Sequence, residues 1–97
     1  MEENDIKLVR LVTGEYLVVE KLFVDVKTII LTKPLAIAFD PQGMSLQPWC
    51  PFVTEEEFTL PIDKMLFHGT PHEKLVDAYK QHFSEIVTPK KPGIITA

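Results

Sequence analysis

Residues 6–23 constrain the fold more than any other part of the chain. They read IKLVRLVTGEYLVVEKLF, two apolar-rich runs on either side of Thr13-Gly14. Glycine adopts a positive φ without steric cost, so Gly14 can close a tight turn between two strands. The pattern predicts a β-hairpin to which the later strands of the domain are added.

The first run places apolar side chains on both faces of an extended strand. Ile6 and Leu8 share one face while Val9 and Leu11 share the other, because successive side chains of a strand alternate. The simplest explanation is a bulge or a strong bend that exchanges the buried face partway along. Strands of small, closed barrels have this property.

The chain stays rich in β-branched and aromatic residues over residues 16–32, which favours strands. The polar residues 24–27 are the only plausible turn in this stretch, so strands are predicted at 15–23 and 27–33. Large and small apolar side chains then alternate over residues 35–39. This alternation predicts a further strand, covered on both sides.

Turn residues mark the next two strands. Asp40-Pro41-Gln42-Gly43 has the composition of a type I turn. The following strand, 44–52, contains Pro48 and Pro51, which lack an N–H and therefore favour an edge strand or bulges. After an acidic loop, a strand is predicted at 58–67 with a kink near Pro61.

The C-terminal part carries the clearest helix signal. Thr70-Pro71-His72-Glu73 combines an N-cap hydroxyl, a proline at the first helical position and a glutamate three residues after the cap. Apolar residues then recur at helical spacing, which predicts a helix at 71–87 and a tail, 88–97, without fixed structure of its own. Residues 1–97 are therefore expected to form one mainly β domain, with its strands at about 5–67.

Composition narrows the location and the class of ligand. The net charge of −4 counts against a broad nucleic-acid footprint, because phosphate binding depends on clustered Lys and Arg. No apolar run approaches the ~20 residues needed to cross a bilayer, and the acidic start MEEND lacks the features of a secretory signal. Together with the single Cys50, these features predict a cytoplasmic protein that does not bind membranes.

The residues give no pattern of an enzyme, a metal site or a cofactor site. His68, His72 and His82 lack the spacing and the Cys or acidic partners of a zinc site. Cys50 has no local signature of a nucleophile and is better explained as a buried small hydrophobe. The four glycines are scattered, so no phosphate-binding loop is present. We expect neither catalysis nor a bound cofactor.

The residues that could contact nucleic acid are few. Lys27 lies beside Asp25 in the polar turn, Trp49 and Phe52 could stack on bases, and Lys90-Lys91 lies in the tail. The other interpretation assigns the aromatic residues to the core or an interface and the lysines to solubility. The small basic footprint favours that second interpretation when the residues are considered alone.

Four segments together resemble a known family. VRLVTGEYLVVE, KPLAIAFDP with MSLQPWCPF, and DKMLFHGTPHEKLVDAYKQHF are together similar to the Sm-like (LSm) proteins of marine, cyanophage-type phages, over roughly residues 5–87. The resemblance implies a small, bent, five-stranded antiparallel Sm-like (SH3-like) barrel, here with a C-terminal α-helix. It also implies a homo-oligomeric ring in which the fourth strand of one subunit pairs with the fifth strand of the next.

The family's RNA-binding motifs match only in part. Gly14 and Asp25 have the spacing of the first Sm motif, but Ile29 stands near the place of the base-contacting Asn. The Arg-Gly pair of the second motif is missing, because that loop reads VTEEE at residues 53–57. Phe67-His68-Gly69 is superficially similar to the Ile-Arg-Gly element but leads into a helix, and the usual Sm helix precedes the first strand.

The resemblance implies a ring that binds RNA or single-stranded nucleic acid, in a bacterial host's cytoplasm if the chain is phage-encoded. The residues expected to carry this binding are Asp25, Lys27, Thr28, Trp49 and Phe52. The alternative is a structural or protein-interaction ring without a nucleic-acid role. The acidic charge and the missing Asn and Arg-Gly favour that alternative.

Overall fold

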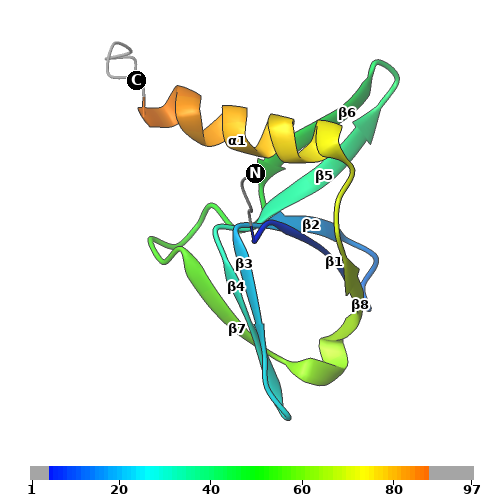
Figure 1. The fold of residues 1–97 in the computed structure, drawn as a ribbon, viewed down its shortest axis with the longest axis vertical. Coiled ribbons are helices and arrows are strands. Elements are labelled where there is room, and N and C mark those ends of the chain that lie inside the picture. Colours follow the sequence, from blue (N-terminus) through cyan, green and yellow to red (C-terminus); the bar gives the residue numbers. More distant parts are fainter. Residues whose placement is uncertain (1–4, 88–97) are drawn as a thin grey trace.

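The structure is a computed structural model that describes residues 5–87 and consists of β-strands followed by one long helix (Figure 1). All strand pairs are antiparallel. The mainly β class and the C-terminal helix predicted from the sequence are therefore confirmed. The elements are β1 (Lys7–Leu11), β2 (Tyr16–Val19), β3 (Lys21–Val24), β4 (Thr28–Thr32), β5 (Leu35–Asp40), β6 (Gly43–Pro48), β7 (Glu57–Pro61), the 3-10 helix η1 (Ile62–Lys64), β8 (Met65–Gly69) and α1 (Glu73–Val87).

The strands form two sheets, with the order β6-β5-β2-β1-β8 in one and β3-β4-β7 in the other. Only Glu20 separates β2 from β3, and only Lys33-Pro34 separates β4 from β5, so two stretches of chain pass from one sheet into the other. The predicted strand 15–23 is thus divided at Glu20. Within residues 5–87 no ladder joins β8 to the three-stranded sheet, and the sheet is not closed into a barrel.

The first hairpin forms as predicted. Gly14 has a φ of 105°, and its N–H donates to the Leu11 carbonyl over 2.9 Å. The Leu11 N–H donates to the Glu15 carbonyl over 3.0 Å. A residue with a Cβ rarely adopts this φ, which explains the glycine.

Both faces of β1 are covered, and this is why its apolar residues alternate irregularly. Val9 and Leu11 belong to one apolar cluster, whereas Ile6 and Leu8 belong to another. A register shift against β8 does occur between Arg10 and Leu11, so the predicted irregularity is present. The proposed exchange of a single buried face is wrong, because neither face is exposed to solvent along its length.

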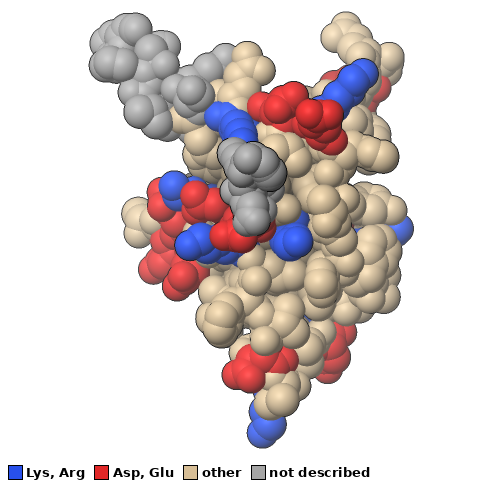
Figure 2. Space-filling model, in the orientation of Figure 1, with Lys and Arg blue, Asp and Glu red and all other residues tan. Residues whose placement is uncertain are grey.

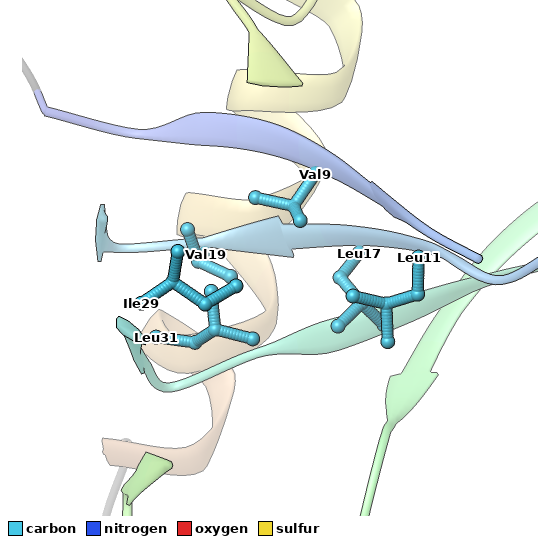
Figure 3. Packing of buried hydrophobic residues seen from close by; sticks show 6 residues of the cluster. All are labelled: Val9, Leu11, Leu17, Val19, Ile29 and Leu31. Carbon is cyan, nitrogen blue, oxygen red and sulfur yellow. The ribbon is translucent and has the colours of Figure 1, made fainter. Parts of the chain in front are cut away.

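The first cluster lies between the two sheets (Figure 3). It joins side chains of β1 and β2 to those of β4. Five of its six members have no exposed surface, and the sixth, Leu11, is 4% exposed. Trp49 and Leu60 pack against it from the second half of the chain. The buried members of this inner cluster are Val9, Leu11, Leu17, Val19, Ile29 and Leu31.

The second cluster lies between the five-stranded sheet and α1. Tyr79 is only 3% exposed and packs with Val18 of β2 and Leu35 of β5. Ile37 lies on the same side as Leu35, whereas Ala36 contacts the inner cluster. The prediction that the strand at 35–39 is covered on both sides is therefore confirmed at its first residues.

Several strands begin or end at other residues than predicted, and proline explains two of these differences. The strand predicted at 44–52 ends at Pro48, at the edge of its sheet, because Pro48 and Pro51 cannot donate to a ladder. The strand predicted at 58–67 is really β7 and β8, which lie in different sheets. The corner between them follows Pro61 and contains η1.

The turns and the start of the helix lie closer to their predicted positions. Val24 pairs with Ile29, which confirms a turn at about residues 24–27. Asp40 pairs with Gly43 around a two-residue loop, and the Asp40 carboxylate accepts from the Gln42 N–H over 2.9 Å.

The helix begins at Glu73 rather than at residue 71. The His72 carbonyl accepts the first helical hydrogen bonds, from Leu75 and Val76. His72 therefore holds the cap position that the sequence assigned to Thr70. The predicted tail, 88–97, lies outside the described residues, and no helix within them has the length and apolar character to cross a membrane.

Gly14→Ala should lower the free energy of unfolding by about 1–2 kcal/mol, because the added Cβ strains a backbone with φ of 105°. Gly69→Ala is the matched control. A Cβ at either glycine meets no atom within 4 Å, and only Gly14 of the two has a positive φ. Urea denaturation of both variants measures the difference, and equal costs would contradict the explanation.

Candidate nucleic-acid interface

Asp25, Lys27 and Thr28 lie at the free end of the β3–β4 hairpin. The Asp25 N–H donates to the Thr28 carbonyl over 2.8 Å, and the Asp25 carboxylate accepts from the Val26 N–H, also over 2.8 Å. The Lys27 carbonyl accepts from the Ile62 N–H of η1 over 2.8 Å, which ties the hairpin to the neighbouring corner. The Asp25 and Lys27 side chains are exposed, and Thr28 is half-buried.

Trp49 is placed differently from the exposed stacking surface that the sequence suggested. Its side chain is half-buried and packs against the inner cluster. Its ring meets Phe58 edge-on, with centroids 5.4 Å apart and planes at 77°, and Nε1 lies 3.5 Å from the Glu15 carboxylate. Most of this indole is therefore engaged within the domain. Phe52, three residues later, is 88% exposed.

The structure does not bring the five predicted residues together. Thr28 pairs with Pro61 at one end of β7, whereas Thr32 pairs with Glu57 at the other end. The loop at residues 49–56, which holds Trp49 and Phe52, precedes Glu57 and thus lies at the end away from the hairpin. Four residue steps separate the two ends, or roughly 13 Å along the strands.

The hairpin carries an apolar surface that the sequence analysis overlooked. Val26 is 83% exposed and Phe23 is 67% exposed, and Val24 is also exposed. The sequence VDVK at residues 24–27 contained a signal for this apolar surface. Valine alternates there with charged residues, and a turn rarely needs two valines. The hairpin end is thus a mostly apolar surface with one lysine.

Among the described residues at the hairpin end, 24–28, Lys27 is the only one with a cationic side chain. Figure 2 shows one face on which charged residues of both signs are interspersed in a largely uncharged surface. The only arginine in the sequence, Arg10, donates to the Tyr16 hydroxyl over 2.5 Å, and its guanidinium lies 4.5 Å from the Tyr16 ring centroid. Arginine is the preferred bidentate partner of phosphate, and here it is engaged with tyrosine.

The first hairpin contributes a carboxylate that stays charged. The Thr13 hydroxyl donates a hydrogen bond to Glu15, and this contact is the main reason that the pKa of the Glu15 carboxyl lies below its ordinary value. Partial burial opposes the shift, and Trp49 adds a weaker contribution in the lowering direction. A charge here adds to the acidic character of the surface.

A small cavity of about 170 Å³ lies between the 49–56 loop and α1, and it brings Cys50, His82 and the carboxylates of Glu55 and Glu56 to one place. Sequence spacing gave no indication of this. An activated nucleophile needs a base within hydrogen-bond reach. Within residues 5–87 no hydrogen bond joins Cys50 to His82, whose ring instead meets Phe83 edge-on at 5.1 Å. The same residues include no group of three side chains that could hold a metal ion.

A second polar arrangement lies where α1 crosses the break between β4 and β5. Lys33 has a φ of 50°, and its N–H donates to the Glu56 carbonyl over 2.6 Å. The Tyr79 hydroxyl donates to the Lys33 carbonyl, also over 2.6 Å. Burial, followed by the nearby Glu20 carboxylate, raises the pKa of Tyr79 above its ordinary value. This contact fastens the helix to the break in the strand.

Comparison with known proteins does not assign the chain to a family. No family model matches the sequence, and no curated protein matches it.

Tyr79→Phe should lower the free energy of unfolding at pH 7 by about 1 kcal/mol, because the Lys33 carbonyl loses its donor. The raised pKa also has a consequence at high pH. Above about pH 10 the unfolded wild type releases the phenol proton while the folded state retains it, so the wild type loses stability as pH rises. The difference between wild type and variant should therefore shrink from pH 9 to pH 11 in urea denaturation. A constant difference would contradict the assignment.

Proposed function

We propose that the protein is an Sm-like protein that assembles into a homo-oligomeric ring and binds RNA or single-stranded nucleic acid without catalysis. The observation that carries the proposal is the order of the strands. Counted along the chain, β2 with β3, β4 with β5, and β6 with β7 across the 49–56 loop make three strands between β1 and β8, each shared between the two sheets. The ladders then connect these five strands in the order fifth, first, second, third, fourth.

The outer strands of this order support assembly. Among the described strands, β7 and β8 each have one paired edge and one open edge. An open edge presents N–H and C=O groups to another chain, and β8 adds exposed apolar side chains, Leu66 at 57% and Phe67 at 49%. In the proposed ring the fourth strand of one subunit pairs with the fifth strand of the next. Such a head-to-tail contact closes into a ring when its rotation permits.

A ring also explains how an acidic chain with few cationic residues at the hairpin could bind nucleic acid. One hairpin holds a single lysine, Lys27, too little for affinity by itself. A ring repeats Asp25, Lys27 and Thr28 once per subunit, and several weak contacts on one molecule combine into tighter binding. The exposed position of Lys27 at the end of a hairpin supports its contact with phosphate.

The oligomer is tested by light scattering coupled to size exclusion. The wild type should have a mass that is a multiple of 11.1 kDa, and Leu66→Glu on β8 should reduce the mass to that of one chain. Phe39→Glu introduces the same charge at a residue 68% exposed on β5, away from the β8 edge, and should leave the mass unchanged. A monomeric wild type at about 100 µM would refute the ring, since that concentration favours even weak association.

Nucleic-acid binding is tested by fluorescence anisotropy with labelled oligo-U, oligo-A and single-stranded DNA. Lys27→Glu should weaken binding at low salt severalfold or more, and should reduce the salt dependence by about one phosphate contact per site. Lys74→Glu, an equal charge change on α1, should have little effect. Absence of binding at low salt, where attraction to phosphate is strongest, would end this proposal.

A protein-interaction ring is the second candidate, and the exposed apolar side chains favour it. Val26, Phe23 and Phe52 are each more than two-thirds exposed, and Glu55 to Glu57 form an exposed acidic stretch beside Phe52. Aromatic residues are enriched at protein interfaces. Pull-down from host cells before and after nuclease treatment distinguishes the candidates, because a partner that survives nuclease supports this one.

A further inference from the structure

A cavity of about 360 Å³ lies where α1 crosses the corner between β2 and β3, and it combines cationic groups with an aromatic wall. We propose that this cavity binds a small ligand with one anionic group and one planar apolar body, which is the chemistry of a nucleotide. Lys21 lies at the start of β3, whereas Asp25 and the free end of the β3–β4 hairpin follow the end of β3. The site is thus separate from the proposed nucleic-acid interface and goes beyond that function.

Three lysines from three different elements meet at this cavity. Lys21 belongs to β3, Lys33 to the break between β4 and β5, and Lys80 to α1. Asp5 and Glu20 are the carboxylates that also line it, so the lining carries an excess of one positive charge in a chain whose net charge is −4. Lysine is a common phosphate ligand. The two carboxylates offset two of the three lysines, and the remaining positive charge can pair with a phosphate.

The aromatic wall consists of Phe83, which offers the ring surface for stacking, backed by Tyr79, which is only 3% exposed. Their ring centroids are 4.9 Å apart with planes tilted by 58°, and Ile6 lies beside them in the lining. Phe83 is half-buried, while the Tyr79 hydroxyl is already engaged with the Lys33 carbonyl. An aromatic surface next to ammonium groups suits a base joined to a phosphate, because it offers stacking and charge pairing to one molecule.

Lys33 is held in place for this contact. Its backbone has a φ of 50°, which costs a non-glycine residue about 1 kcal/mol, and glycine or asparagine would adopt it more readily. Hydrogen bonds to Glu56 and from Tyr79 fix this conformation from both sides. The Lys33 ammonium then lies 5.5 Å from the Phe83 ring centroid, at the junction of charge and aromatic wall. Strained residues of this kind concentrate at ligand sites.

The size of the cavity agrees with such a ligand. Small-molecule sites in proteins are usually about 300–1,000 Å³ and mainly apolar, with a few polar groups that fix orientation. A second cavity of about 490 Å³ shares Asp5 and Lys21 with the first and continues along the outer face of β3 and β4 past Phe23 and Ile30. The two together leave room for a sugar or a second nucleotide unit.

The test is a titration of the ¹⁵N-labelled full-length chain with AMP, adenosine and inorganic phosphate at low salt, followed by NMR. AMP should cause saturable shifts at the amides of residues 20–21, 33 and 79–83, and should bind more tightly than adenosine or phosphate. Each of those probes lacks half of the proposed contacts. Absence of saturable shifts with AMP at millimolar concentration would overturn the proposal, as would equal affinity for AMP and phosphate.

Variants separate specific binding from general attraction. Lys80→Glu should weaken AMP binding about tenfold or more, and Lys80→Arg should retain most of it. Lys74→Glu makes the same charge change on the same helix but lies outside this cavity. Its effect should stay below about twofold, because an exposed distant charge is screened. If Lys74→Glu weakens AMP binding as much as Lys80→Glu, the site is refuted.

Two further measurements identify the role of the ring and the source of the ligand. Phe83→Leu keeps an apolar side chain against the core and should weaken AMP binding without changing phosphate binding. Equal loss of affinity for both ligands would refute stacking.

A 5′-phosphorylated oligo-A distinguishes two sources of the ligand. If it shifts the same amides and binds more tightly than AMP, the ligand is the 5′ end of a nucleic-acid strand. If it binds more weakly than AMP, the ligand is a free nucleotide. Lys27→Glu should leave AMP binding unchanged, so this site and the proposed ring function can fail independently.

Discussion

The packing of β2 between two apolar clusters is the constraint on which the rest of the structure depends. Leu17 and Val19 point into the inner cluster, while Val18 points toward α1, and all three have no exposed surface. The inner cluster holds the three-stranded sheet against β1 and β2, and the second cluster, between the five-stranded sheet and α1, holds the helix. Removal of a buried Leu or Ile side chain to Ala typically costs about 2–5 kcal/mol, so a single change here would loosen both layers.

Features set by neighbouring residues could be predicted from the sequence. Gly14 specifies a turn because its backbone requirement is local, and the helix is recognisable because its apolar spacing is repeated over four turns. The start of the helix was misplaced by two residues, since Thr70 and His72 are both able to precede it. The path of the chain after β8 determines which residue caps the helix, and no local sequence pattern specifies that path.

Features set by distant partners could not be predicted in the same way. Glu20 divides one continuous strand into β2 and β3, yet neither glycine nor proline marks the place. The corner exists because β2 pairs with β1 and β5 while β3 pairs with β4. Likewise, nothing near Trp49 in the sequence shows that its ring meets Phe58, so that of Trp49 and Phe52 it is Phe52 that is exposed. The cavity beside Lys33 also depends on elements more than forty residues apart, as the contact between Lys33 and Tyr79 shows.

The second cluster affects which apolar surface is exposed while the chain is being synthesised. Ile6, Val18 and Leu35 belong to the part of the chain that is made early, whereas Tyr79, which packs with them, is made much later. Translation at about 5–20 residues per second leaves that side of the sheet uncovered for several seconds after β5 is complete. β8, which pairs with β1, is also made late. A nascent chain of this protein thus exposes an apolar face until α1 has been made, and exposed apolar surface of this kind is prone to aggregation.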